Sequence, residues 1–272
     1  MKLALAFLAA TTIAAGPTRV PPKIPPVITV RAHEFAFEGP KTLKPGATTF
    51  RLINNGKELH HLTLLKLAKG KTFKDFTDAM KVPGPPPRWI TGFGGPNPAT
   101  PGSTAEATLS LEPGEYVMIC FVPSPGEVAP HAAKGMMSPL TVSEGSERTP
   151  MPKGDVTIKL TDYTFGLSKP LTKGKHVINV ENDASQSHEI VLVKLKPGKK
   201  AGDFMNFVEK DLMKSVPPGL PIGGVGFIDK GHPATFPVNL DAGTYALLCF
   251  VPDAKDGKPH VQHGMLTQFD VK

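Results

Sequence analysis

The chain has 272 residues and a formal net charge of +7 at pH 7. This length suits one large domain or two of ordinary size, and 30 Pro and 27 Gly indicate many turns and little long helix. The basic residues are scattered among only three Tyr and one Trp, which argues against nucleic-acid binding and leaves acidic proteins or anionic headgroups as partners.

The N-terminus, MKLALAFLAATTIAAG, has one Lys followed by an apolar run from Leu3 to Ala15. This pattern is typical of a secretory leader, and the run is too short to cross a bilayer comfortably. We therefore expect residues 1–16 to be a leader that is either cleaved or retained as a membrane anchor. The protein is predicted to be periplasmic or extracellular, with membrane association if the leader is retained. Residues 17–26, PTRVPPKIPP, are predicted to form an extended Pro-rich arm.

The rest of the chain repeats one unit, predicted as domains of residues 27–142 and 155–272 joined by a polar linker, residues 143–154. HHLTLLKLAKGK matches HEIVLVKLKPGK, and GEYVMICFVP matches GTYALLCFVP. Each copy has alternating β-branched runs between Pro and Gly turns, and one stretch with helical periodicity, KTFKDFTDAMK or GDFMNFVEKDLMK. The predicted fold class is therefore all-β, with two tandem antiparallel β-sandwiches that each carry one short helical insertion.

The only two Cys lie at equivalent points of the copies, and each is followed by ten residues, a His, four residues and a Met. A disulfide between them would require the interiors of two domains to touch. A free thiol in an exported protein is a liability unless it is buried or bound to a metal. Each Cys is thus either a small buried hydrophobe or a metal ligand, and the recurrence of the whole order in both copies favours the ligand.

Strand alternation puts each Cys at the end of an inward-facing row, after Tyr116 and Met118 in copy one and after Tyr245 and Leu247 in copy two. An earlier His begins another such row in each copy. A sandwich that joins these strand ends sets an imidazole beside a thiolate, and the loop after the Cys returns a second imidazole and a thioether. Two nitrogens, a thiolate and a long axial thioether are the ligand set of a mononuclear blue-copper site. Zinc would bind there but could do no redox work.

The segments GEYVMIC with PHAAKGM, and GTYALLC with PHVQHGM, resemble the cupredoxins, the family of blue copper proteins. The resemblance covers nearly all of both copies and implies Greek-key β-sandwich domains, one copper per domain and the transfer of single electrons. The ligands that it implies are His60, Cys120, His131 and Met136 in copy one, and His188, Cys249, His260 and Met265 in copy two. The chain departs from the family in its long loop between Cys and His, and after the first ligand His, where the family often has Asn and this chain has His61 or Glu189.

Catalysis has less support in the sequence. Two-domain copper nitrite reductases resemble this architecture but place a His directly before the Cys, where this chain has Ile119 and Leu248. The His-x-His pairs of multicopper oxidases, Walker-type Gly loops, nucleophile elbows and paired-carboxylate motifs are not evident. We therefore expect a protein that is not an enzyme.

Two functional hypotheses follow. The first is an exported copper-binding electron-transfer protein with one mononuclear blue-copper-type site per domain, whose positive surface meets an acidic redox protein such as a cytochrome or a membrane electron-transfer complex. The alternative is a metal-free structural or adaptor subunit of a membrane-bound respiratory or photosynthetic electron-transfer complex, held by its leader or Pro-rich arm. The FVP of residues 121–123 and 250–252 is either core packing or an apolar rim over which a partner meets an exposed imidazole edge.

Overall fold

The computed structural model describes residues 24–82, 84, 86–145 and 149–272. The predicted leader and most of the Pro-rich arm lie outside the described residues, as does part of the predicted linker. Within the described ranges, no helix is long and apolar enough to cross a membrane.

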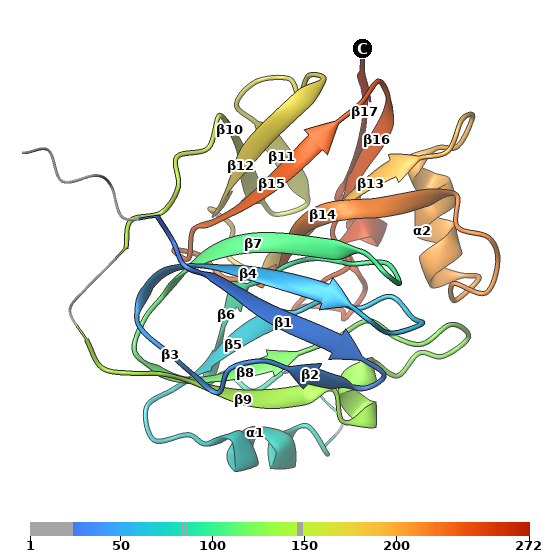
Figure 1. Cartoon of the computed structure of the whole chain (residues 1–272). Coiled ribbons are helices and arrows are strands. Elements are labelled where there is room, and N and C mark those ends of the chain that lie inside the picture. Colours follow the sequence, from blue (N-terminus) through green and yellow to red (C-terminus); the bar gives the residue numbers. More distant parts are fainter. Residues whose placement is uncertain (1–23, 83, 85, 146–148) are drawn as a thin grey trace, which may run out of the picture.

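The described chain is mainly β-strand, and the two sequence copies contribute similar sets of elements (Figure 1). The strands of copy one are β1 (Val27–His33), β2 (Ala36–Glu38), β3 (Thr42–Leu43), β4 (Gly46–Asn54), β5 (Thr63–Leu67), β6 (Ile90–Gly94), β7 (Thr104–Leu111), β8 (Gly114–Ile119) and β9 (Met137–Val142). Those of copy two are β10 (Val156–Thr161), β11 (Thr164–Leu167), β12 (Gly174–Asn182), β13 (His188–Leu195), β14 (Gly219–Ile228), β15 (Ala234–Leu240), β16 (Gly243–Leu248) and β17 (Leu266–Val271). The helices are α1 (Phe73–Ala79) and α2 (Ala201–Glu209), with short 3-10 helices η1 (His131–Lys134) and η2 (His260–His263).

The strands form two sheets, ordered β11-β10-β12-β15-β7-β4-β1-β2 and β17-β16-β13-β14-β6-β5-β8-β9-β3. This arrangement confirms the predicted all-β fold with two cupredoxin-like sandwich halves. Most strand pairs are antiparallel, as predicted, but β1 pairs in parallel with β4, β10 with β12, and β3 with β9. In copy one the chain leaves β1, crosses to the other sheet at β3 and returns to β4, and such a crossover permits parallel pairing.

The two halves are joined edge to edge by equivalent strands. Strand β6 pairs antiparallel with β14 where Phe93 lies opposite Ile228, and β7 pairs antiparallel with β15 where Leu109 lies opposite Ala234. Equivalent elements therefore meet about an approximate twofold axis. Because each half covers an edge of the other, neither sandwich presents these strand edges to solvent. One hydrophobic core cluster accordingly contains residues of both copies.

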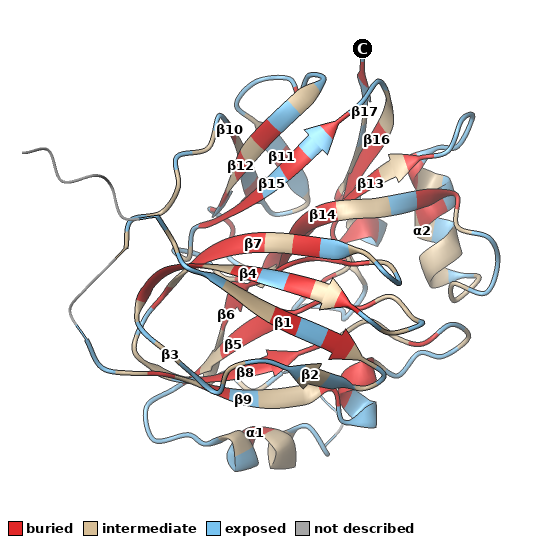
Figure 2. Ribbon diagram, in the orientation of Figure 1, coloured by how far each residue is buried: buried red, intermediate tan, exposed pale blue. Residues whose placement is uncertain are grey.

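Each predicted helix covers the outer side of the sheet in its own half. Buried Phe76 of α1 packs in a cluster with β5 and β8, and Phe204 of α2 packs in one with β13 and β16. Figure 2 shows the buried residues along the strands, with the helices largely exposed or intermediate. The second helix ends at Glu209, earlier than its periodicity indicates, because Leu212 and Met213 adopt the left-handed backbone conformation.

A buried Tyr anchors the turn before β8 and the turn before β16. The hydroxyl of Tyr116 donates to the carbonyl of Glu112 at 2.9 Å and accepts from the N–H of Glu112 at 3.1 Å. Tyr245 makes the same pair of hydrogen bonds with Asp241, at 2.9 and 3.2 Å. The strands that lead to the two Cys residues are therefore each held at their other end by the same pair of hydrogen bonds.

Removing either hydroxyl should destabilise the protein. We expect Tyr116→Phe and Tyr245→Phe each to lower the free energy of unfolding by about 1 kcal/mol, because backbone groups of the turn lose their partner. Urea denaturation followed by circular dichroism measures the change. A double variant whose loss equals the sum of the single losses would indicate independent anchors. An unchanged midpoint in both single variants would contradict this role.

Candidate metal centres

In copy one the side chains of His60, Cys120 and His131 meet. His60 lies just before β5, Cys120 directly follows β8, and His131 begins η1. The Nδ1 atoms of the two imidazoles are 3.1 Å apart, and Nδ1 of His131 is 3.6 Å from Sγ of Cys120. All three side chains are fully buried. We call this group the first centre.

Copy two gathers His188, Cys249 and His260 in the same way. Sγ of Cys249 lies 3.8 Å from Nδ1 of His188 and 3.4 Å from Nδ1 of His260, and all three residues are fully buried. The reason is the same in both halves, because β5 pairs antiparallel with β8 and β13 with β16, which sets the start of one strand beside the end of the other. We call this group the second centre.

The two predicted Met ligands are buried next to these groups. Met136 donates its N–H to the carbonyl of His131 at 3.0 Å and accepts the N–H of Cys120 at 3.2 Å. Met265 makes the same two backbone hydrogen bonds, with His260 at 3.0 Å and Cys249 at 3.3 Å. In each copy a Gly with positive φ ends the 3-10 helix just before the Met, and this turn returns the chain to the Cys.

The long loop between Cys and His is tied down in both copies. The N–H of His131 donates to the carbonyl of Val122 at 2.8 Å, and that of His260 donates to Val251 at 3.0 Å. In addition, Pro123 forms an isolated bridge with Pro130, as its counterpart does in copy two. The ten intervening residues therefore close into a hairpin-like loop that fixes the His at its end.

Burial controls the charge of these groups. It raises the pKa of the Cys120 thiol to about 12 and also raises the pKa of Cys249. Burial lowers the pKa of His60, and together with the neighbouring His188 it lowers that of His260 to about 4. Without a cation the thiols and imidazoles are therefore neutral. A bound metal ion would compensate the thiolate charge and accept the Nδ1 lone pairs.

A carboxylate lies behind each imidazole of the first centre. Nε2 of His131 donates to Glu58 at 2.9 Å, and Nε2 of His60 lies 3.5 Å from Glu34. The second centre repeats this arrangement, with Nε2 of His188 3.2 Å from an oxygen of Asp162 and Nε2 of His260 3.8 Å from one of Asp253. A proton held by a carboxylate on Nε2 of His131 or His188 leaves the Nδ1 lone pair free to face a metal, whereas Nε2 of His60 and Nε2 of His260 form no hydrogen bond with their neighbouring carboxylates.

These carboxylates were not among the predicted site residues, although the repeat contains a signal for Glu34 and Asp162. Glu34-Phe35 and Asp162-Tyr163 occupy equivalent positions after β1 and β10. The Phe35 ring lies 5.0 Å from that of His131, and the Tyr163 ring lies 5.4 Å from that of His260.

The loop His residues are consequently not exposed. Both His131 and His260 have no solvent-accessible surface, so the suggested docking over an exposed imidazole edge is wrong. The acid and aromatic residues that follow β1 and β10 cover the rings instead. The recurrence of an acid followed by an aromatic residue, Glu34-Phe35 and Asp162-Tyr163, is the sequence signal that these residues cover the imidazole rings.

The residue after the first predicted ligand His contacts the Cys in both copies. The backbone N–H of His61 donates to Sγ of Cys120 at 3.5 Å, and that of Glu189 donates to Sγ of Cys249 at 3.3 Å. Their side chains differ, but each accepts a hydrogen bond from the backbone N–H of the residue that follows the Cys. Nε2 of His61 accepts the N–H of Phe121 at 2.7 Å, and Oε1 of Glu189 accepts the N–H of Phe250 at 2.9 Å. The departure from Asn at this position therefore preserves the support of the Cys.

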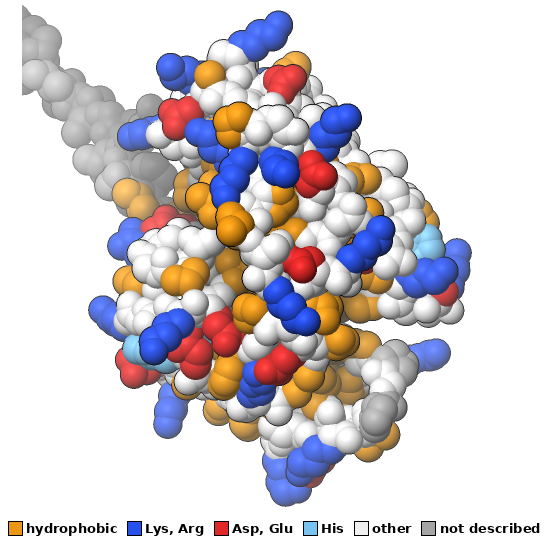
Figure 3. Space-filling view, turned by 90° about the vertical axis from the view of Figure 1, so that its right-hand side faces the viewer, with side chains coloured by type: hydrophobic (Ala, Val, Ile, Leu, Met, Phe, Trp, Pro, Cys, Tyr) orange, Lys and Arg blue, Asp and Glu red, His pale blue; other side chains and the backbone are white. Residues whose placement is uncertain are grey.

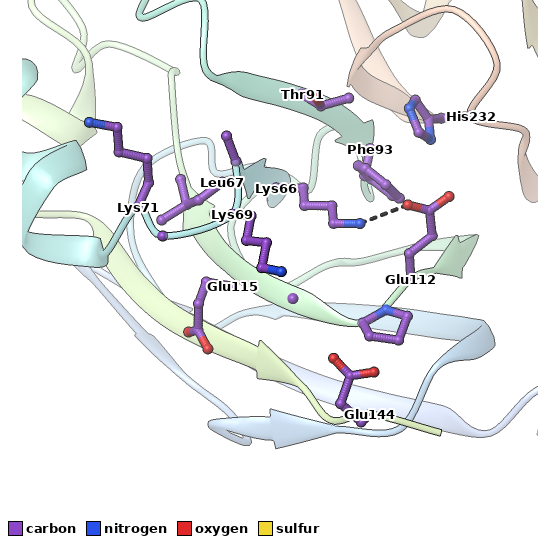
Figure 4. A pocket seen from close by; sticks show the side chains of 14 residues that line it. Lys66, Leu67, Lys69, Lys71, Thr91, Phe93, Glu112, Glu115, Glu144 and His232 are labelled. Carbon is purple, nitrogen blue, oxygen red and sulfur yellow. Dashed lines mark hydrogen bonds and ion pairs between the residues drawn. The ribbon is translucent and has the colours of Figure 1, made fainter. Parts of the chain in front are cut away.

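Two other features are separate from the centres. A cavity of about 650 Å³ has Lys66 and Glu112 on its wall, paired at 2.7 Å, and His232 at its rim (Figure 4). None of the eight predicted ligands lines it. Asp253, Asp256 and His263 also lie within reach of one another, but both carboxylates already accept other hydrogen bonds.

The donor chemistry identifies the metal class that fits. Soft thiolate with imidazole suits copper, and carboxylates behind the imidazoles orient the rings. The two buried His-Cys-His groups therefore suit copper binding.

No protein-family profile and no curated protein sequence matches the chain. Among solved structures, reduced auracyanin from Roseiflexus castenholzii is 20% identical and covers 44% of this chain and 97% of its own, with a TM-score of 0.31. A blue copper oxidase from Nitrosomonas europaea is 14% identical, covers 90% and 85%, and has a TM-score of 0.27. A copper nitrite reductase from the same organism is 15% identical, covers 91% and 93%, and has a TM-score of 0.25. The predicted two-domain cupredoxin-like arrangement is confirmed by the two sandwich halves and their two His-Cys-His groups.

The expectation that the protein is not an enzyme is contradicted by these matches. The structures that cover about 90% of this chain are described as an oxidase and a nitrite reductase, which are enzymes. The absence of a His before each Cys excludes only one way of linking a second copper. The missing His does not exclude enzymes as a class, so the expectation that this protein is not an enzyme is withdrawn.

The carboxylate behind His131 provides a test of the first centre. Glu58→Gln keeps the side-chain shape but weakens the acceptor of the Nε2 proton. We expect the copper affinity of the first centre to fall about tenfold, the lower end of the usual cost of such changes. Competition against a chelator in a Cys249→Ser background measures the first centre alone. The same substitution in a Cys120→Ser background should leave the second centre unchanged, and an equal loss at both centres would contradict a local role.

Proposed function

We propose that the protein binds one copper ion in each half and transfers single electrons. One observation carries this proposal. In each half, two imidazoles and a buried Cys sulfur come together in the same arrangement, with Nδ1 atoms facing the sulfur. A structural core has no need to bury neutral His residues together with a thiol.

Each copper would have four ligands from its own half. These are His60, Cys120, His131 and Met136 in the first centre, and His188, Cys249, His260 and Met265 in the second. Copper in such a site changes its charge by one unit without needing a substrate. The chain's own part is to hold the ligands still: backbone hydrogen bonds fix the loop His and the Met, and carboxylates fix the ring orientation. A fixed ligand set limits the rearrangement that accompanies electron transfer.

We further propose an exported protein that meets an acidic redox partner. The net charge of +7 supports attraction to an acidic surface. On the face drawn in Figure 3, Lys and Arg side chains are spread widely, with Asp and Glu between them. This distribution favours general electrostatic attraction to a cytochrome or a membrane electron-transfer complex over a single basic docking patch.

Copper binding has a direct optical test. Adding Cu(II) to the purified metal-free protein should produce an intense visible thiolate-to-copper band. Cys120→Ser should remove only the contribution of the first centre, and Cys249→Ser only that of the second, because each sulfur belongs to one centre. The double variant should remain colourless. If the wild-type protein also stays colourless, the metal-free adaptor becomes the better interpretation.

Export depends on residues 1–16. Deleting them should retain the protein inside the producing cell, because a secretory leader is the signal for translocation. Cell fractionation compares the deletion with the full chain, and N-terminal sequencing of the exported form shows whether the leader is cleaved or retained. Unchanged export of the deletion would contradict a leader.

A further inference from the structure

A buried polar residue lies at the junction of the two halves. Asn97 follows β6, the strand of copy one that pairs with β14 of copy two (Figure 1). Its side chain is 2% exposed. It lies between the residues that follow the first His of each centre, His61 of copy one and Glu189 of copy two.

Asn97 is hydrogen-bonded to both of these residues. Nδ1 of His61 lies 3.0 Å from Oδ1 of Asn97, and Nδ2 of Asn97 donates to Oε2 of Glu189 at 2.9 Å. The same Nδ2 also donates to the carbonyl of Ile190 at 3.2 Å. His61 and Glu189 are themselves only 5% and 8% exposed, so the whole connection is shielded from water. We call these three side chains the bridge.

The donors and acceptors of the bridge are mutually consistent. Nε2 of His61 accepts the N–H of Phe121, so its Nδ1 carries the proton that is donated to Asn97. Asn97 then donates to the carboxylate of Glu189, whose other oxygen accepts the N–H of Phe250. No member needs a second tautomer or a flipped amide to complete its hydrogen bonds.

Both ends of the bridge lead directly to a candidate copper ligand. Phe121 and Phe250 are the residues that follow Cys120 and Cys249 in the chain. His61 and Glu189 also donate their backbone N–H groups to these two sulfurs. A continuous path of covalent bonds and four hydrogen bonds therefore joins one Cys sulfur to the other across the junction.

We propose that the His61–Asn97–Glu189 bridge is the route by which one electron passes between the two centres. This inference rests on the proposed copper function and adds that the two centres exchange electrons with each other within one molecule. The transfer moves one electron and no atom: the reduced centre is oxidised by one unit and the other is reduced by one unit. The protons on His61 and Asn97 stay in place, and no bond is formed or broken.

The surroundings of the bridge distinguish it from ordinary junction packing. Apolar pairs lie on the adjoining strands, as where Phe93 lies opposite Ile228 and Leu109 opposite Ala234. Another polar side-chain contact at this junction, from the N–H of Gly92 to Asp229, involves neither the bridge nor a residue of either centre. Stability alone would be served as well by apolar side chains, because buried polar networks bring little net stabilisation. A cross-copy contact outside the bridge offers a comparison, since the ring of His232 in copy two packs 4.1 Å from that of Phe93 in copy one and forms no part of the bridge.

The first experiment examines the bridge in the metal-free protein. Nitrogen NMR should show His61 as the neutral tautomer with its proton on Nδ1, protected from exchange with water. Asn97→Leu, which has similar size but no polar atoms, should abolish that protection, whereas His232→Leu should not. A His61 proton on Nε2, or one that exchanges freely in the wild-type protein, would overturn the proposed path.

The second experiment measures exchange between the centres. In copper-loaded protein, Met136→Leu provides a background in which the two centres differ in potential. After rapid partial reduction, electrons redistribute in a phase whose rate does not depend on protein concentration. We expect Asn97→Leu to slow this phase, because it removes two of the four hydrogen bonds of the path. We expect His232→Leu, which removes a cross-copy contact outside the bridge, to leave the rate unchanged.

The outcomes separate this inference from the proposed function. Normal copper bands and potentials with a slowed phase in Asn97→Leu support the bridge. Normal bands with an unchanged rate, or shifted potentials with an unchanged rate, overturn the bridge and leave copper binding intact. An absent copper band in the wild-type protein overturns both. If Asn97→Leu does not fold, Glu189→Gln interrupts the path from the other half, because its single carbonyl oxygen cannot accept from both Asn97 and Phe250 and its amide N–H donor then faces one of these two donors. The same rate comparison applies.

Discussion

The register between the strand at the first His and the strand that precedes the Cys is the constraint on which both centres depend. In copy one Thr63 lies opposite Ile119, and in copy two Val191 lies opposite Leu248. A slip of one residue would turn every side chain of the strand to the other face and separate the imidazole from the sulfur. The turns held by Tyr116 and Tyr245 help to exclude such a slip.

Burial of the His and Cys side chains imposes a second requirement, that almost every polar atom around them has a hydrogen-bond partner. The carboxylates behind the imidazoles, the N–H donors to sulfur and the bridge at the junction meet this requirement with different residues in the two halves. His61 and Glu189 illustrate it well, since an imidazole and a carboxylate both accept a backbone N–H and both reach Asn97. The copies have thus diverged in residue type while preserving the hydrogen-bonding role.

The edge-to-edge union of the halves decides how the centres relate. Because β6 pairs with β14 and β7 with β15, the sheets continue through both copies. The residues after each first His then face the same junction. The two halves are therefore connected by paired strands as well as by the linker between the copies. This contact gives a physical basis for electron transfer between the two centres.

The sequence by itself determined the all-β class, the repeat, and the His and Cys residues that meet in each half, because strand alternation and the order of ligands are local and appear twice. Only the tertiary structure decided the parallel pairings, the joined sheets, the carboxylates behind the imidazoles, the cover over His131 and His260, and the role of Asn97. These features depend on contacts between residues far apart in the chain, and Glu58 and Asp253 are not even equivalent in the repeat. A single sequence carries periodicity along each strand, but the pairing of one strand with another is fixed by packing in three dimensions.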